Sequence, residues 1–139
     1  MWDIVLKLVL AALIGFIIGM GNKTVGDPSG RVFSIVCVGS TLITITSMEF
    51  IQIAGYPWVG DPGRLAAQVI SALGFIGTGF IWITDDRDIR GLSVASSLWV
   101  TAIVGMIIGI GLKYISTIVL AFLVAIYYLA DVINKLKKR

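Results

Sequence analysis

The chain has 139 residues, of which 58% are hydrophobic and 14% are charged, and its formal net charge is +3. A soluble domain of this length carries roughly 25% charged residues, so the composition excludes an ordinary soluble protein and indicates that lipid surrounds most of the apolar surface. Histidine is absent, which removes the commonest general base and the commonest transition-metal ligand. The sequence therefore predicts one transmembrane domain covering residues 1–139.

Five apolar segments are long enough, or nearly long enough, to cross a hydrocarbon core of about 30 Å as helices. The first lacks the basic start of a cleavable signal peptide, so we expect it to be a transmembrane helix. The fold class is therefore an all-α integral membrane protein with a bundle of about five transmembrane helices. A four-helix bundle whose last hairpin lies partly at the membrane interface is the alternative. The expected helices cover residues 4–20, 32–54, 65–84, 92–112 and 114–133.

The distribution of Lys and Arg predicts the orientation of these helices, because basic residues accumulate on the cytoplasmic side. With five spans, eight basic residues fall on one side of the membrane and three on the other. This places the N-terminus outside and the C-terminus in the cytoplasm, in a multi-pass protein of the inner (plasma) membrane. The eight are Lys23, Arg31, Arg87, Arg90, Lys135, Lys137, Lys138 and Arg139, and the three are Lys7, Arg64 and Lys113.

The third expected helix begins with the sequence DPGRLAAQ, whose polar residues are unusual for a segment in lipid. Asp61 can cap the first N–H groups of the helix, and Arg64 and Gln68 follow on one face. Glu49 and Lys7 are expected at a similar depth on neighbouring helices. Because an ionisable group within a span costs roughly 2.5–3.5 kcal/mol at the helix centre, we predict that Arg64 pairs with Glu49 or Asp61 and that Gln68 completes a polar pocket open to the outer side. A helix cap with side chains that reach the membrane surface is the alternative.

Small and hydroxyl residues recur at helical spacing on several of the expected helices. Such faces let helix backbones approach closely, so helix packing is the favoured interpretation and a permeation path is the alternative. The third helix contributes Ser71, Gly74, Gly77, Thr78 and Gly79, and the fourth contributes Ser93, Ser97, Thr101, Gly105 and Gly109, with Trp99 among them. The first helix contributes Ala11, Gly15 and Gly19, and the second contributes Ser40, Thr44 and Ser47.

Between the third and fourth expected helices, the sequence TDDRDIRG places three carboxylates and two guanidinium groups in one short cytoplasmic loop. Asp85, Asp86 and Asp88 could approach a hard cation through water, but Arg87 and Arg90 oppose a divalent site. A solvated loop whose charges pair with one another is therefore favoured, and no metal site is predicted.

No combination of residues in the sequence indicates catalysis. There is no Ser–His or Cys–His pair, no phosphate-binding loop and no metal-ligand cluster. We therefore expect a protein that is not an enzyme, that needs no cofactor and that does not bind nucleic acid.

Three motifs in the chain resemble the MgtC/SapB family of bacterial and archaeal inner-membrane proteins. That family carries a DP-x-R-x-A-A-Q segment, a GFLGAG-like segment and a V-R-G-L-T-T-A-A-x-L-W-x-T-A segment, and this chain matches their order and spacing over residues 60–111. The matching residues are Asp61, Pro62, Arg64, Ala66, Ala67 and Gln68; Gly74, Phe75, Ile76, Gly77 and Gly79; and Arg90, Gly91, Leu92, Ala95, Leu98, Trp99, Thr101 and Ala102.

The resemblance implies a five-helix membrane domain with links to growth under magnesium limitation and to bacterial survival inside host cells. It also implies an action on another membrane complex, since some relatives restrain the F-type ATP synthase rather than move magnesium themselves. Family members usually carry an acidic–basic run after the first helix, where this chain has Gly21, Asn22 and Lys23. Many also carry a soluble C-terminal domain, and we expect this chain to correspond to the transmembrane domain alone.

Two hypotheses for the function follow. The first is a non-enzymatic regulator that binds another membrane protein within the lipid bilayer, with cation homeostasis as the affected process and self-association into homo-oligomers as a further expectation. The second is a small oligomeric transporter or channel for cations such as magnesium. Few acids lie well inside a span, which favours the regulator. The pore of the channel would be lined by Ser71, Thr78, Ser97 and Thr101, with Asp61 and Glu49 at its mouth.

Overall fold

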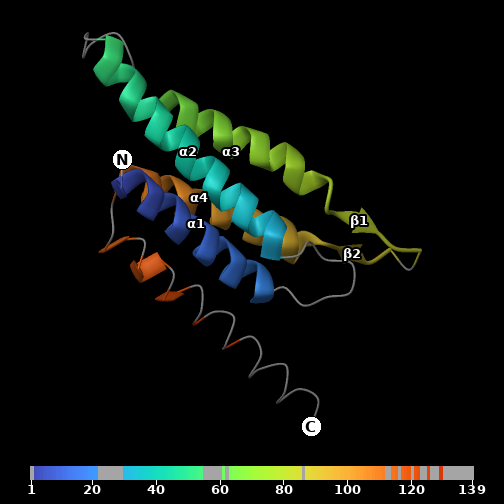
Figure 1. Cartoon of the computed structure of the whole chain (residues 1–139). Coiled ribbons are helices and arrows are strands. Elements are labelled where there is room, and N and C mark those ends of the chain that lie inside the picture. The colour runs from blue at the N-terminus through green and yellow to red at the C-terminus, as the bar shows by residue number, and fades with distance from the viewer. Residues whose placement is uncertain are drawn as a thin grey trace.

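The computed structural model describes residues 2–21, 30–54, 61, 63–85 and 87–111 and, further along the chain, residues 114–115, 117–119, 121–122, 125 and 129. Its numbered elements are four helices and a short antiparallel β-hairpin (Figure 1). The helices are α1 (Trp2–Gly21), α2 (Gly30–Ala54), α3 (Gly63–Thr78) and α4 (Leu92–Ile110), and the strands are β1 (Trp82–Ile83) and β2 (Ile89–Arg90).

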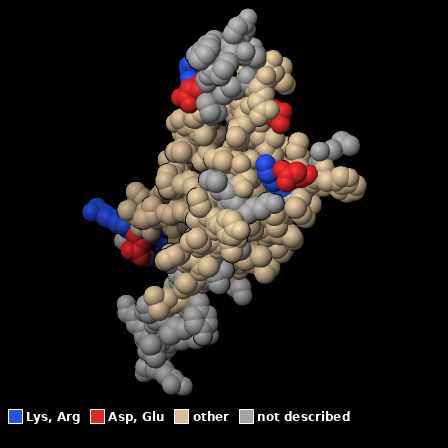
Figure 2. Space-filling model, turned by 90° about the vertical axis from the view of Figure 1, so that its left-hand side faces the viewer, with Lys and Arg blue, Asp and Glu red and all other residues tan. Residues whose placement is uncertain are grey.

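Three helices in the described part of the chain are long and apolar enough to cross a membrane, and they cover Trp2–Gly21, Gly30–Phe50 and Leu92–Ile110. α3 has 16 residues, which at 1.5 Å per residue is about 24 Å and shorter than the hydrocarbon core. On the face drawn in Figure 2, the charged side chains of the described residues gather in a few small groups, and the described surface between them is uncharged. The chain is therefore a mostly helical protein whose surface suits lipid.

The fifth expected helix, residues 114–133, lies largely outside the described residues. Those that the structure does describe there, at 114–115, 117–119, 121–122, 125 and 129, are helical.

The packed core lies between α1, α2 and α4, and α2 contacts both of the other helices (Figure 1). Glycines let the backbones approach. A methyl group placed on Gly15 would lie 2.7 Å from Ser34 Cα, and one on Gly105 would overlap the carbonyl oxygen of Cys37. The helix backbones therefore touch directly at these points. The buried apolar side chains around them are Ala11, Ile14, Ile18, Phe33, Cys37, Val94, Leu98, Val104 and Ile108.

Two hydroxyl groups connect α2 to its neighbours by hydrogen bonds. Ser34 Oγ donates to the carbonyl oxygen of Ala12 in α1 at 2.9 Å. Thr41 Oγ1, which is fully buried, shares its one hydrogen between the carbonyl oxygen of Gly105 in α4 at 2.8 Å and that of Cys37 in α2 at 2.9 Å. Such bonds matter in a membrane because lipid offers no hydrogen-bond partner to a buried hydroxyl.

α3 lies against α4 and α2, on the side of the bundle away from α1 (Figure 1). Its buried residues are Val69, Leu73 and Gly77, which recur every four residues along one face. Val69 and Leu73 pack with Ala102 and Met106 of α4. The contact between α3 and α4 is therefore mainly apolar.

α3 ends at Thr78, so the expectation that this helix continues to Thr84 is wrong. After a turn, β1 pairs with β2 in an antiparallel hairpin that extends beyond the helices (Figure 1). Gly77 and Gly79 weaken the helix at this point, while the Ile, Trp and Thr residues that follow favour extended backbone. The hydropathy of these residues alone does not distinguish a helix end from a strand.

Gly91 joins the hairpin to α4 in a conformation that requires glycine. Its φ angle is 81°, in the left-handed region. A methyl group at this position would also overlap the carbonyl oxygen of Phe80. The glycine therefore lets β2 turn directly into the first residue of α4.

Candidate functional site

The polar residues of α3 lie on the side of the helix that faces away from the other helices. Arg64, Gln68, Ser71 and Thr78 are all exposed. At 100° per residue, these four residues and Phe75 fall within about 80° of one another, opposite the buried face of the helix. We call these five residues the α3 outer face; Phe75 has 82% of its surface exposed.

The hydroxyl groups of the α3 outer face are satisfied within the helix itself. Ser71 Oγ donates to the carbonyl oxygen of Ala67 at 3.2 Å, and Thr78 Oγ1 donates to that of Phe75 at 2.7 Å. The Arg64 guanidinium and the Gln68 amide carry most of the polar character that remains. Gly74 lies beside this face, and a methyl group there would have no atom within 4 Å.

Asp61 caps the start of α3. Its Oδ1 accepts a hydrogen bond from the Gly63 N–H at 2.8 Å, and its main-chain oxygen accepts one from the Arg64 N–H at 3.2 Å. The structure records no ion pair between Arg64 and a carboxylate of the described residues, including Asp61 and Glu49. A carboxylate partner for Arg64 therefore stays a prediction, and the exposed position of Arg64 leaves room for one from another molecule.

Lys7 has partners of its own, on the opposite side of the bundle from the α3 outer face. Its Nζ lies 3.4 Å from Asp3 Oδ2 and donates to the carbonyl oxygen of Gly109 at 3.1 Å. Glu49 is exposed near the end of α2. Among the described residues, Lys7 therefore contacts Asp3 and Gly109, and a pocket that joins Lys7 to Arg64 and Glu49 stays a prediction.

The residues predicted for helix packing or for a pore divide into two groups. Gly77, Thr101 and Gly105 are buried, and Ser97 is half-buried. Thr101 Oγ1 donates to the carbonyl oxygen of Ser97 at 2.7 Å, within α4. The exposed members are Ser71, Gly74, Thr78, Gly79, Ser93 and Trp99.

The predicted cytoplasmic loop, residues 84–91, covers the turn that follows β1 and the second strand, β2. Asp88 Oδ2 lies 3.7 Å from Arg90 Nη2, and both side chains are mostly exposed. Asp85 is exposed as well, and Asp86 lies outside the described residues. Arg87 has a φ angle of 63°, in the left-handed region, at the tip of the turn.

Sequence reasoning missed two contacts that organise this structure. The pairing of Asp3 with Lys7 follows the four-residue spacing of helix ion pairs, so the sequence did contain a signal for it. The bond from Thr41 to Gly105 joins residues 64 positions apart. A single sequence has no signal for that contact.

These features define the class of protein: a helical membrane protein with a glycine-packed core and one helix that turns polar residues outward. Residues 8–136 match the model of the MgtC family. Because this match covers most of the chain, the chain belongs to the MgtC family.

Named relatives agree with this assignment. The chain is 39% identical over 113 residues to YhiD of Escherichia coli (strain K12), which is named as a candidate magnesium transporter. The matched region covers 79% of this chain and 52% of YhiD. It is 34% identical over 142 residues to SapB of Bacillus subtilis (strain 168), covering 96% of this chain and 60% of SapB. It is 32% identical over 112 residues to MgtC of Salmonella typhimurium (strain LT2), covering 80% of this chain and 45% of MgtC.

The chain spans about half the length of the curated relatives it matches. No solved structure matches it significantly.

Proposed function

We propose that this chain is a non-enzymatic regulator in the inner membrane that binds another membrane complex through the α3 outer face. Membership of the MgtC family and the magnesium-related name of its relative YhiD connect it with magnesium homeostasis. The resemblance to the MgtC/SapB family suggests the F-type ATP synthase as the complex that is bound.

The observation that carries this proposal is the outward direction of the polar residues of α3. Arg64 and Gln68 are exposed, while Val69 and Leu73 hold the other side of the helix against α4. Ionisable and amide groups of a membrane helix are found facing protein or water rather than lipid. Contact with a second membrane protein would supply the carboxylate and hydrogen-bond acceptors that the described part of this chain does not offer to Arg64.

The packing argues against a pore through a single copy of the chain. Thr101 is fully buried, and Gly105 lies against the backbone of α2, so no path passes between these helices. Ser71 and Thr78 lie on the outer side of α3 instead. A cation channel, the alternative function, would therefore need several copies arranged with their α3 outer faces around a common pore.

The proposal includes a topology of five spans, with the N-terminus outside and the C-terminus in the cytoplasm. The basic residues counted from the sequence support this orientation. An introduced cysteine tests it, since Cys37 is buried. A membrane-impermeant thiol reagent should label Asp85→Cys only from the cytoplasmic side and Asp61→Cys only from the outer side. Labelling of both from one side would reject the topology.

Photo-cross-linking in cells tests the binding function. A photoreactive amino acid at Gln68 on the α3 outer face should form a cross-link to a second membrane protein, and mass spectrometry identifies that protein. The same amino acid at Thr46, an exposed position on α2, is the matched control and should give no such product. Equal products from both positions, or none from Gln68, would reject α3 as the binding surface.

Two activity measurements then separate the regulator from the channel. For the regulator, ATP-driven proton pumping by inverted membrane vesicles should fall when the chain is produced and should recover with Arg64→Leu. For the channel, purified chain in proteoliposomes should take up Mg²⁺, and Glu49→Gln and Asp61→Asn should abolish the uptake. If Mg²⁺ uptake showed this dependence on the two acids and proton pumping did not change, the channel would replace the regulator as the proposed function.

A further inference from the structure

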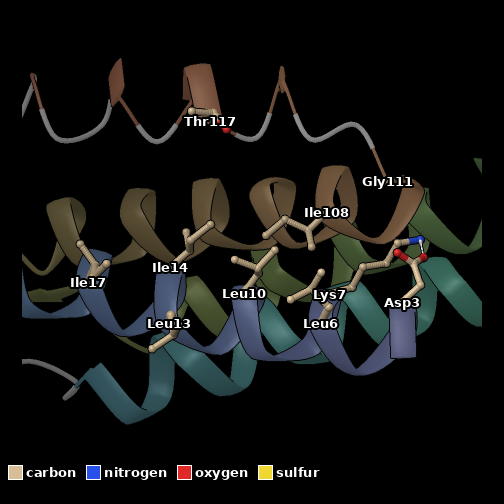
Figure 3. Close-up of a pocket in the computed structure, with 10 residues that line it drawn as sticks. All are labelled: Asp3, Leu6, Lys7, Leu10, Leu13, Ile14, Ile17, Ile108, Gly111 and Thr117. Atoms are coloured by element: carbon tan, nitrogen blue, oxygen red, sulfur yellow. Dashed lines mark ion pairs between the residues drawn. The ribbon is translucent and has the colours of Figure 1, made fainter. Parts of the chain in front are cut away.

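A groove of about 400 Å³ runs along α1, on the side that faces the end of α4 and Thr117 (Figure 3). Most of its wall is apolar, but Lys7 and Asp3 lie together at one end, next to Gly111 (Figure 3). The volume falls in the range of small-ligand sites. The apolar residues of the wall are Leu6, Leu10, Leu13, Ile14, Ile17 and Ile108.

The length of the groove is close to the thickness of one leaflet of a bilayer. From Leu6 to Ile17 it extends for about 16 Å at 1.5 Å per residue. This is about half of the 30 Å hydrocarbon core. Leu6 and Leu13 are more than half exposed, so part of the wall of the groove lies at the surface of the molecule. A long apolar chain that enters from the membrane surface therefore fits its shape.

The charged end of the groove offers both a donor and an acceptor near the membrane surface, where α1 begins. Lys7 Nζ is oriented by Asp3 and by the carbonyl oxygen of Gly109. An ammonium group has three donor hydrogens, so one remains for a third acceptor. The Asp3 side chain is 65% exposed, which leaves its carboxylate accessible to a cation.

We propose that this groove binds one acyl chain of a phospholipid whose headgroup carries both a phosphate and an ammonium group, as in phosphatidylethanolamine. The phosphate accepts a hydrogen bond from Lys7 Nζ, and the ammonium group contacts the carboxylate of Asp3. Phosphatidylglycerol has the phosphate without the ammonium group, so it would bring a second negative charge beside Asp3. The paired charges therefore favour the zwitterionic lipid. This site is independent of the α3 outer face.

Native mass spectrometry of the full chain tests the proposal. Protein in mild detergent is equilibrated with equal amounts of phosphatidylethanolamine and phosphatidylglycerol, and the lipids retained by the folded protein are counted. Wild type should retain the first lipid about two- to fivefold more than the second, as expected for one exposed charge pair. Lys7→Met should lose most of the bound lipid. Asp3→Asn, whose side chain is mostly exposed, should fold normally and bring the ratio close to one.

A second pair of variants tests the apolar part of the groove. Leu10→Trp fills the groove without changing a charge and should reduce the retained lipid. Leu42→Trp, at a similarly exposed position on α2, is the matched control and should retain as much lipid as wild type. Equal retention of the two lipids by wild type, or an unchanged ratio in Asp3→Asn, would overturn the headgroup assignment. Full retention of lipid by Leu10→Trp would show that the groove is not the binding site. A structure in which side chains of this chain fill the groove would show the same.

Discussion

α2 and α3 both pack against α4, and both carry hydroxyl residues at helical spacing, but only α2 turns these residues toward α4. Thr41 and Thr44 of α2 are buried, whereas Ser71 and Thr78 of α3 are exposed. α3 instead uses Val69 and its apolar neighbours for the contact. Small and hydroxyl residues therefore mark a helix face that suits close contact. They do not indicate whether the contact is made within the chain or with another molecule.

The difference follows from what α4 offers on each side. Toward α2 it presents Gly105 and Gly109, which leave room for the backbone and the hydroxyl groups of α2. Toward α3 it presents Ala102 and Met106, which match apolar side chains. A polar face on α3 would gain no hydrogen bonds from that surface, so it lies on the outside.

The largest expected effect on stability comes from a bulky side chain at the contact between α2 and α4, compared with the same side chain on the exposed side of α3. Gly105→Leu must displace the backbone of α2, and we expect it to lower the free energy of unfolding by about 3 kcal/mol or more. Gly74→Leu is the matched control, because a side chain there meets open space and should change the stability little. Thermal unfolding in detergent measures both. Similar melting temperatures for the two variants would contradict the close packing of α2 on α4.

The next effect concerns the junction that separates α3 from α4. Asn tolerates a left-handed φ angle, so Gly111→Asn should be accepted at the end of α4. Gly91→Asn should still lower the free energy of unfolding by about 1–3 kcal/mol, because its Cβ would overlap the carbonyl oxygen of Phe80. The same unfolding measurement compares them. If both variants were equally stable, the turn at Gly91 would not be as tight as described.

A smaller effect distinguishes the hydroxyl groups of the two helices. Thr41→Val removes a hydrogen bond between helices and should lower the free energy of unfolding by about 0.6–1.7 kcal/mol. Thr78→Val removes only a bond within α3 and should have almost no effect. Chemical unfolding in mixed micelles can resolve this difference. A larger effect of Thr78→Val would mean that its face is packed rather than exposed.

The smallest effect on stability is expected at Arg64, the residue whose replacement should most affect binding of the proposed partner. Arg64→Met removes an exposed group with no ion pair among the described residues, so the free energy of unfolding should change by less than about 0.5 kcal/mol. Lys7→Met loses the contacts with Asp3 and Gly109 and should be destabilised by about 1 kcal/mol. Equal losses in the two variants, measured by unfolding of the purified chain, would indicate that Arg64 has a partner within the chain.

Much of the fold could be predicted because each long helix is an apolar segment of about 20 residues, so its hydropathy pattern is easily recognised. The helices that contain Lys7, Cys37 and Thr101 were expected with bounds within a few residues of those observed. The end of α3 could not be predicted in this way, because Ile81 and Trp82 suit a membrane helix and a strand equally well. The partners of Lys7 also depend on α4, which contributes the carbonyl oxygen of Gly109 from 102 positions away.

The sequence by itself determined that the chain has long apolar helices suited to a membrane, where those helices lie and which family it belongs to, because these properties depend on composition, local spacing and motif. Only the tertiary structure decided that Arg64 and Gln68 face outward and that Gly105 receives α2. The direction of a helix face depends on the shape of its neighbours. A periodic pattern of small residues is compatible with either direction until those neighbours are in place.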